Sequence, residues 1–544
     1  MITQLKRIHR RCLLQIMRSK KAERKPLSFS TTMRNPNRIV SFLNCLLPYE
    51  NQILTHEVVM KVIHNAIKRK LYNPVIINRT AELSYILKND DETYSDKQIE
   101  FIIEKSPQKH KEAGFAYGWD SRFDTIFKLP MEFGFVKYAM EEPIKISATG
   151  HMLIDALNEE EPNEEKIEMV FLNSMMKYQS NNPYRKNANS NVPLILLLQV
   201  LKLLKEDPEE NGAGVFRQEL SLFICWPTND AKALYHKIKQ IRGAVGYSYS
   251  DEYMYEICLE LLGASDQQRN RFKLVQICGE AVDEYIRKMR TTGIISLRGN
   301  GRFIDYNVWE IEKINYILDK YSNYKTFTSK DEYFEYMGDV DTVVVSMESA
   351  TPADTTDLRK SALKKFALEY SKETIYAELY KVCNKTASTD YMLKILPNPV
   401  RLEFLTSIAM VQNFKNLDVT PNYTIDDEGL PTNTASGGKA DIVCIDKEYK
   451  SLVEVTLMCG RQDQVNNEII PIRRHLLEAK KNQENTFSVF VAPVIHEDTI
   501  EIANWYKVKD NLDIVTYAID EFVKTIAKEE HIAGMLRETS LREN

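Results

Sequence analysis

Several signatures that would define a function class directly are missing from this 544-residue sequence. Its eight cysteines form no Cys-x2-Cys pair and have no histidine-rich companion, which argues against zinc or disulfides and for reduced thiols in a cytosol. No run approaches about eighteen apolar residues, so no transmembrane helix and no membrane partner are expected. The glycine strings at 299–301 and 436–439 lack the spacing of a phosphate-binding P-loop, and no internal repeat is present.

A general surplus of positive charge is also missing, since the formal net charge is −5. A DNA-binding surface would therefore have to be local, with the acidic residues placed elsewhere. The composition, 43% hydrophobic and 27% charged, is typical of globular protein with sizeable cores. The length predicts about three or four domains.

Positive charge does gather in residues 1–26, where nine lysines and arginines accompany a single acid, Glu23. A transit peptide or a basic DNA-binding arm has this composition. A solvated extension has it too, and it is the simplest interpretation of this segment.

A β-hairpin with two acids at one end is predicted in the C-terminal part. Two β-type runs flank the charged, turn-like residues 446–449. If these four residues form the loop, Ile445 faces Lys450, and counting outward places Asp441 opposite Glu454. Directly opposed side chains have Cβ atoms roughly 4.5–5.5 Å apart, and two carboxylates repel at that separation unless a cation lies between them. Mg²⁺, typically held by one or two carboxylates and a substrate phosphate, is the expected cation; the alternative is a surface hairpin with scattered acids.

The spacing of these acids carries a first resemblance. Asp441, a spacer and then Glu454-Val455-Thr456 resemble the Asp…(Asp/Glu)-x-Lys metal site of restriction-type, PD-(D/E)xK-like nucleases. Thr456 stands where that motif has lysine.

A second resemblance is carried by the N-terminal part. The string Phe-Ser-Thr-Thr-Met-Arg-Asn-Pro at 29–36 resembles the opening of the AlwI-type (type IIS) restriction endonucleases. Its hydroxyls, Asn35, Arg34 and the following Arg38 could hold phosphates or read base edges. Helix capping, with Pro36 in the first turn, explains the same residues.

Residues 118–150 support the same family. The string Gly-Trp-Asp-Ser-Arg-Phe-Asp, which contains Arg122, leads into two short strands and a helix capped by Ser147 or Thr149. This order is that of a winged helix. A polar loop at 178–191 follows, with Arg185 and Lys186.

Residues 283–306 predict a second winged helix. An amphipathic helix carrying Arg287 and Lys288 ends at a glycine and is followed by two strands around an Asn-Gly tip, the favoured hairpin dipeptide. Arg298 and Arg302 flank that tip, which concentrates positive charge locally. The candidate DNA-contacting residues are thus Arg34, Asn35, Arg38, Arg122, Arg185, Lys186, Arg287, Lys288, Arg298 and Arg302.

Three more residues near the hairpin are candidates through the resemblance. Glu403 borders the apolar face of an amphipathic helix at 400–408, and nucleases of this class often place a glutamate on the helix before the hairpin, near the metal. Without the family resemblance, Glu403 is explained equally well as an ordinary acid at the edge of the apolar face of this helix. Glu468 and His475 lie seven residues apart, so an uninterrupted helix would present both on one face, but Pro471 predicts a helix start at about Ile472.

The resemblance covers most of the chain from about residue 27 and is strongest at 28–36, 114–150 and 400–475. It implies that Asp441 and Glu454 are metal ligands, that Glu403 completes the shell, and that Glu468 and His475 are the accessory acid and base. Because residue 456 is not lysine, another residue must take the role of the motif lysine. Either Lys439 or Lys480 supplies the positive charge, or His475 acts as base.

The expected fold is a multidomain α+β protein, with a winged-helix or helix-turn-helix DNA-recognition half and an α/β restriction-endonuclease-like cleavage domain with a mixed sheet. The expected boundaries are a basic extension at 1–26, recognition subdomains at 27–160 and 161–325, a linker at 326–357 and the cleavage domain at 358–544.

The expected function is Mg²⁺-dependent cleavage of double-stranded DNA a few base pairs outside a short asymmetric site. A strand-specific nickase, or one subunit of a heterodimeric cutter, is an alternative that differs in how cleavage domains pair. A DNA-binding regulator with an inactive nuclease-like domain is an alternative of another class. The family also implies transient dimerisation through cleavage domains or a second subunit, and functional pairing with a DNA methyltransferase.

Overall fold

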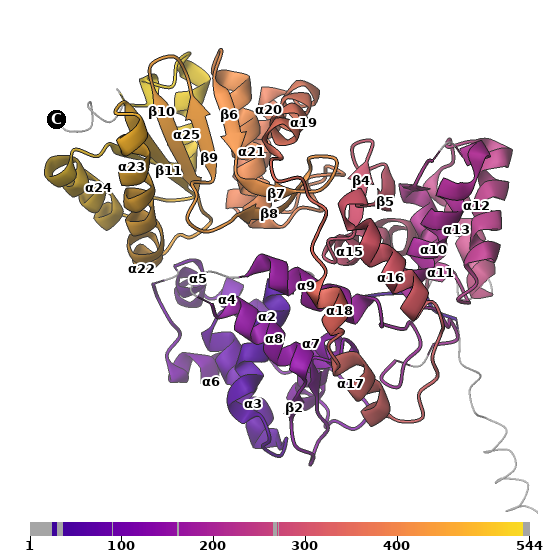
Figure 1. Ribbon diagram of the computed structural model, residues 1–544. Coiled ribbons are helices and arrows are strands. Elements are labelled where there is room, and N and C mark those ends of the chain that lie inside the picture. Colours follow the sequence, from indigo (N-terminus) through magenta and orange to yellow (C-terminus); the bar gives the residue numbers. More distant parts are fainter. Residues whose placement is uncertain are drawn as a thin grey trace, which may run out of the picture.

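The chain folds into three lobes, which Figure 1 shows in the order of the sequence from indigo to yellow. The computed structural model describes residues 24–29, 36–89, 91–159, 163–185, 187–210, 212–264, 269 and 271–536. None of the helices in these ranges is both long and apolar enough to cross a membrane. The predicted residues Arg34, Asn35 and Lys186 and most of the basic extension lie outside the described ranges.

The first lobe is mainly helical, with one very short strand pair. Strand β1 pairs antiparallel with β2, and Ser147 caps the helix that follows by accepting a hydrogen bond from the backbone N–H of Gly150 (3.1 Å), as predicted. The elements are α2 (Pro36–Leu46), η2 (Leu47–Tyr49), α3 (His56–Lys68), α4 (Val75–Arg79), α5 (Ala81–Lys88), α6 (Asp96–Glu104), α7 (Trp119–Glu132), β1 (Val136–Lys137), β2 (Lys145–Ile146), α8 (Ala148–Leu157) and α9 (Glu164–Met175).

The segment predicted as a linker, 326–357, returns to this first lobe. It forms α17 (Lys330–Gly338) and α18 (Thr342–Ser346), and Tyr333 and Met337 are fully buried. The Tyr333 hydroxyl donates to the carbonyl of Glu132 (3.1 Å). The linker prediction is therefore wrong over most of its length, because the acidic and hydroxyl residues that suggested a flexible joint alternate with a few large side chains that reach the core.

The second lobe contains the predicted helix and hairpin of 283–306. Helix α15 ends before Gly293, whose positive φ of 72° suits the turn, and β4 and β5 pair antiparallel around the Asn-Gly tip. A third strand, β3, joins the other side of β5. The elements are α10 (Pro193–Glu206), η3 (Pro208–Glu210), β3 (Val215–Phe216), η4 (Arg217–Glu219), α11 (Leu220–Cys225), α12 (Ala231–Val245), α13 (Asp251–Leu262), η5 (Val275–Glu280), α15 (Ala281–Arg290), β4 (Ile295–Arg298), β5 (Phe303–Tyr306), η6 (Val308–Glu310) and α16 (Ile311–Tyr321).

The third lobe is built on a five-stranded mixed sheet with the order β12-β11-β10-β9-β6. The pairs β6/β9 and β9/β10 are antiparallel, whereas β10/β11 and β11/β12 are parallel. The expected mixed α+β class is thus observed. The elements are α19 (Thr356–Glu369), α20 (Lys372–Cys383), α21 (Asn398–Asn413), β6 (Asp418–Pro421), β7 (Tyr423–Ile425), β8 (Pro431–Ala435), β9 (Ile442–Ile445), β10 (Lys450–Val455), α22 (Arg461–Asp463), η7 (Gln464–Ile469), α23 (Ile470–Asn482), β11 (Thr486–Ala492), α24 (Glu497–Asp510), β12 (Ile514–Ala518) and α25 (Ile519–Lys528).

Helices cover both faces of this sheet (Figure 1). Because side chains alternate along a strand, Leu452 and Val453 of β10 point to opposite faces. Leu452 packs in a cluster with Ile472 and Leu476 of α23, and Val453 belongs to the larger core that includes α21 and α25. The predicted hairpin thus lies between two helical layers.

Candidate functional site

The hairpin has the predicted register. Ile445 pairs with Lys450 and Ile442 with Val453, so Asp441, the residue before β9, faces Glu454 on β10. The backbone N–H of Asp441 donates to Glu454 Oε2 (3.2 Å), and the N–H of Val455 donates to Asp441 Oδ2 (2.7 Å). Each carboxylate is therefore oriented by a backbone donor of the opposite strand.

A third carboxylate reaches this end of the hairpin from α21. Glu403 Oε2 accepts a hydrogen bond from the backbone N–H of Ala435 at the end of β8 (3.1 Å), and Glu403 is only 4% exposed. Burial, and secondarily the charge of Glu454, raise the pKa of Glu403 to about 8. Burial followed by the charges of Glu403 and Glu454 raises the pKa of Asp441 well above its usual range. The three acids thus repel one another, and a cation bound among them would relieve the repulsion.

Glu468 approaches the same group from the η7 segment, a π-helical turn. Burial, with further contributions from Glu454 and Asp463, raises its pKa to about 7, while a hydrogen bond with Thr456 opposes the shift. Thr456, which replaces the lysine of the motif, is itself buried. In place of the positive charge of a lysine, this position therefore provides a hydroxyl that forms a hydrogen bond with Glu468.

The helical path around Pro471 differs from the prediction. The chain is helical from Arg461 onward, and Pro471 lies in the first turn of α23 without beginning the helical path. Because proline cannot donate the backbone hydrogen bond that continues an α-helix, the chain passes it through a π turn and not through a break. Both Glu468 and His475 consequently face Glu454.

His475 completes the group. Its Nδ1 lies 2.9 Å from Glu454 Oε1, its side chain is 12% exposed, and its Nε2 is buried without a hydrogen-bond partner. An ionised carboxylate can only accept, so Nδ1 carries the hydrogen of this bond. In the neutral ring Nε2 is then the free acceptor, as a general base requires.

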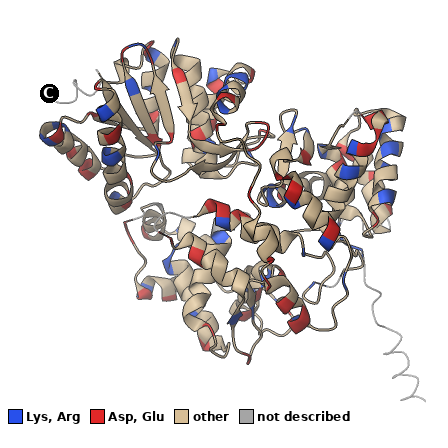
Figure 2. Ribbon diagram, in the orientation of Figure 1, with Lys and Arg blue, Asp and Glu red and all other residues tan. Residues whose placement is uncertain are grey.

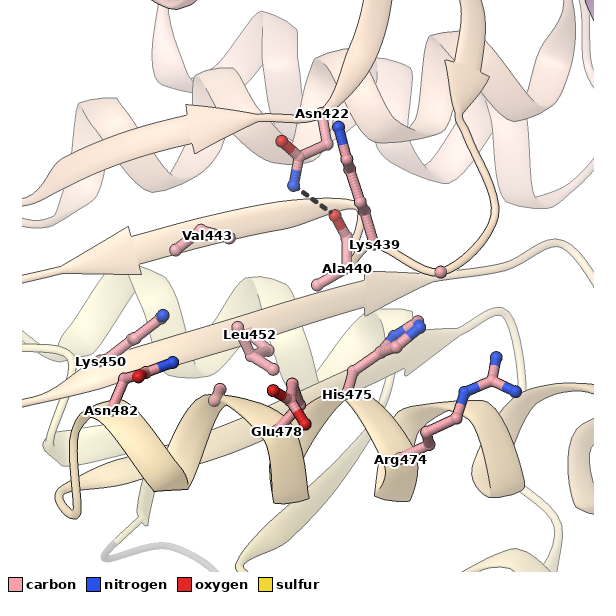
Figure 3. A pocket seen from close by; sticks show the side chains of 12 residues that line it. Asn422, Lys439, Ala440, Val443, Lys450, Leu452, Arg474, His475, Glu478 and Asn482 are labelled. Atoms are coloured by element: carbon pink, nitrogen blue, oxygen red, sulfur yellow. Dashed lines mark hydrogen bonds between the residues drawn. The ribbon is translucent and has the colours of Figure 1, made fainter.

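The two lysines considered in place of the motif lysine occupy different environments. Lys480 donates to the backbone carbonyl of Asn511 (2.9 Å), away from the acids near the C-terminal end of α23. Lys439 lines a pocket together with His475 and Ala440, the residue that precedes Asp441 (Figure 3). Of the two, only Lys439 is close to the carboxylates.

The donor set at this site suits a hard divalent cation. Among the residues that the structure describes, no three His, Cys, Asp or Glu side chains are gathered as a metal cage. Mg²⁺ usually takes only one or two protein carboxylates and completes its shell with water and substrate phosphate. Asp441 and Glu454 are sufficient on that basis, and a ligand role for Glu403 stays a prediction.

The predicted DNA-contacting residues of the first lobe make intramolecular contacts. Arg38 lies over the ring of Phe42 (5.5 Å), and Arg122 lies over the ring of Tyr72 (4.8 Å). Arg185 contradicts the prediction most clearly, because its Nε forms an ion pair with the fully buried Glu132 (3.0 Å). A side chain that compensates a buried charge is not available to a phosphate.

The helix and hairpin of the second lobe face the third lobe. Arg298 pairs with Asp305 (2.9 Å), Asp427 (2.6 Å) and Glu428, and the last two lie in the β7–β8 turn. Arg287 pairs with Glu284 of its own helix (2.6 Å) and donates to a backbone carbonyl, and Lys288 is buried.

These contacts contradict the prediction that Arg287, Lys288 and Arg298 face DNA. The three side chains instead stabilise the protein interior and the contact between the second and third lobes. Arg302 is exposed, and its role in DNA binding stays a prediction. Lys and Arg are interspersed with Asp and Glu in every lobe (Figure 2).

Two positioning residues were not identified from the sequence. Gln464 is fully buried, and its amide makes four hydrogen bonds that tie the start of the Glu468 segment to the loop after β10, the β11–α24 connection and the start of α24. Asp91 of the first lobe accepts the backbone N–H of Arg461 (2.5 Å) and of Gln462 (2.9 Å). Neither side chain has a local sequence signal, since every partner lies elsewhere in the chain.

Comparisons with known proteins identify a family for this chain. The profile of the AlwI restriction endonuclease family matches residues 131–354 and 354–525. No curated protein sequence matches.

Similar solved structures include the small subunit of the heterodimeric restriction endonuclease R.BspD6I, which is 23% identical over 31% of this chain and 87% of its own, with a TM-score of 0.26. They also include restriction endonuclease FokI, alone and bound to DNA. FokI alone is 11% identical over 96% of this chain and 97% of its own, with a TM-score of 0.24; the DNA complex is 11% identical over 96% and 98%, with a TM-score of 0.23. Since the family profile matches well over half of the chain, this protein belongs to the AlwI restriction endonuclease family.

Proposed function

We propose that the protein is a Mg²⁺-dependent, site-specific DNA endonuclease of type IIS. The first two lobes would recognise a short asymmetric sequence in double-stranded DNA, and the third would hydrolyse phosphodiester bonds a few base pairs outside it. The observation that carries the proposal is the pair Asp441 and Glu454, held face to face by reciprocal backbone N–H groups in a chain of a restriction endonuclease family.

Each residue of the group has a distinct role in this mechanism. Asp441 and Glu454 would hold Mg²⁺, which neutralises charge at the scissile phosphate and lowers the pKa of bound water. His475 Nε2 accepts the proton of the attacking water, while its Nδ1–H bond to Glu454 keeps the ring in the required tautomer. Thr456 keeps Glu468 directed at the group, and Glu403 adds a third carboxylate at its floor.

The test is cleavage of supercoiled plasmids of known sequence, with Mg²⁺ and with EDTA, resolved on agarose. Discrete linear fragments that need Mg²⁺ would support the proposal and map the site. Asp441→Asn should lose at least about 100-fold of the activity while still binding DNA. The matched control is Glu448→Gln, which removes an exposed carboxylate from the turn of the same hairpin and should cleave normally. Full cleavage by Asp441→Asn would overturn the assignment.

Other outcomes of the same assay identify the alternatives. Open circles alone would mean a strand-specific nickase or a missing second subunit. Binding without cleavage on plasmids that contain every five-base sequence would favour the DNA-binding regulator, to which the replacement of the motif lysine by Thr456 gives some support. Double-strand cleavage whose rate rises more than linearly with enzyme would support transient pairing of cleavage domains. Functional pairing with a methyltransferase remains part of the proposal.

A further inference from the structure

A pocket of about 490 Å³ lies beside the carboxylates, between the hairpin and α23. Figure 3 shows Lys450 and Asn482 toward one end of it and His475 and Arg474 toward the other, with Lys439 on the side formed by the start of β9. Its floor is apolar, with Val443 and Leu452 side by side in the hairpin register. The pocket is thus an open cleft with a charged rim and an apolar base.

The rim carries positive charge that the protein does not neutralise. Lys439, Lys450 and Arg474 have no carboxylate partner among the described residues. The single acid of the lining, Glu478, is paired with Lys481 outside it (2.6 Å). The residue that precedes Arg474 in the same helix differs, because Arg473 is paired with Asp510 (2.7 Å). Three unmatched cations around one cleft therefore indicate an anionic ligand.

The position of the cleft relates that anion to the site. Lys450, Leu452 and Glu454 share one face of β10, because side chains alternate along a strand. Four residues at about 3.3 Å each place Lys450 roughly 13 Å along the strand from Glu454. His475 belongs to both places, since its Nδ1 contacts Glu454 and its ring lines the cleft. The cleft therefore begins at the carboxylates and extends away from them.

We propose that this cleft seats the sugar-phosphate backbone of the strand that is cut, with Lys439, Lys450 and Arg474 contacting phosphates on one side of the scissile bond. The inference rests on the proposed endonuclease function and adds to it the path of the substrate strand. Cations suit phosphates spaced along a strand at about 3.4 Å of helix axis, and Val443 and Leu452 provide an apolar surface for deoxyribose. The cations and the apolar surface both extend along the cleft, as an extended sugar-phosphate backbone would.

The experiment compares wild-type protein with Lys450→Gln and Arg474→Gln under single-turnover conditions on a duplex that contains the mapped site. Each variant should lower the cleavage rate at subsaturating enzyme about three- to tenfold near physiological salt. The slope of log rate against log salt should become shallower by roughly 0.9 for each phosphate contact removed. Lys524→Gln on α25, on the opposite side of the sheet, removes the same charge and should behave as wild type.

A second measurement locates the contacts. Neutral methylphosphonates are placed one at a time at the phosphates flanking the cut, never at the cut itself. Positions that slow the wild-type protein should have no further effect on the variant that has already lost the contact, because a removed interaction cannot be removed twice.

The outcomes separate the two proposals. Unchanged salt slopes and an unchanged methylphosphonate pattern in both variants, with a wild-type protein that cleaves, would overturn the path of the strand and leave the endonuclease assignment intact. A wild-type protein that cleaves no DNA would overturn both.

Discussion

Replacing Glu403 by glutamine should stabilise the metal-free protein at alkaline pH while impairing cleavage. The carboxyl is 4% exposed, and its pKa is raised from 4.5 to about 8. A raised carboxyl pKa means that the folded state favours the protonated form, so stability is fully present below pH 4.5 and is lost as the pH rises through 8. At pH 7.5 the cost to the wild-type protein is up to about 4 kcal/mol, at about 1.4 kcal/mol per pH unit. Glutamine removes this cost and keeps an oxygen for the N–H of Ala435.

The assay is thermal unfolding of both proteins from pH 5 to 9, in EDTA and in Mg²⁺. In EDTA the two midpoints should lie close together at pH 5, and the variant should be the more stable one at pH 8, by roughly 2–4 °C per kcal/mol for a lobe of this size. Saturating Mg²⁺ should raise the wild-type midpoint, by about 2.7 kcal/mol at a hundredfold excess over the dissociation constant, and the variant much less. Glu448→Gln should match the wild-type protein both in EDTA at every pH and in Mg²⁺. A variant less stable than wild type at pH 8, or a difference that does not vary with pH, would refute the reasoning.

Three further predictions concern other contacts. Arg298→Ala removes the ion-pair partner of Asp427, whose side chain is 3% exposed, and it should cost about 3 kcal/mol and expose the joint between the second and third lobes to limited proteolysis; an unchanged digestion pattern would contradict the role of this joint. Arg185→Ala strips the fully buried Glu132 of its ion pair and should cost about 3–5 kcal/mol in chemical denaturation, whereas a loss of DNA affinity at unchanged stability would restore the DNA-binding prediction. His475→Gln should lower the cleavage rate roughly 10²–10⁴-fold with DNA binding retained; a wild-type cleavage rate would exclude His475 as the base.

The candidate site was predictable where its geometry is local. In a hairpin the loop length determines the register, and side chains alternate between the two faces of each strand. Asp441 could therefore be placed opposite Glu454 from the amino-acid sequence alone. Glu403 needed the family resemblance, because a boundary acid on a helix has no distinguishing pattern. The contact between Thr456 and Glu468 was not predictable, since it depends on a π turn that no periodicity indicates.

The second lobe shows the opposite case. The helix and hairpin of 283–306 were predicted correctly as elements, through a glycine and an Asn-Gly turn. Their orientation was not, because the partners of Arg298 are acids about 130 residues away in the chain. A cluster of basic residues has the same sequence pattern whether it faces DNA or an acidic turn of the same protein, and only tertiary packing separates the two.

The π turn at Gln464–Ile469 has a consequence for how this chain tolerates a deletion. A π turn holds one residue more than the α-helical turn it replaces. A chain one residue shorter between Gln464 and Pro471 would close as ordinary α-helix, and at 3.6 residues per turn the intervening side chains would rotate by about 100°. Glu468 would then point away from Thr456 and Glu454 although every acid and its neighbours were still encoded. We therefore expect the loss of a single codon in this segment to impair the proposed cleavage without removing any acid of the proposed group.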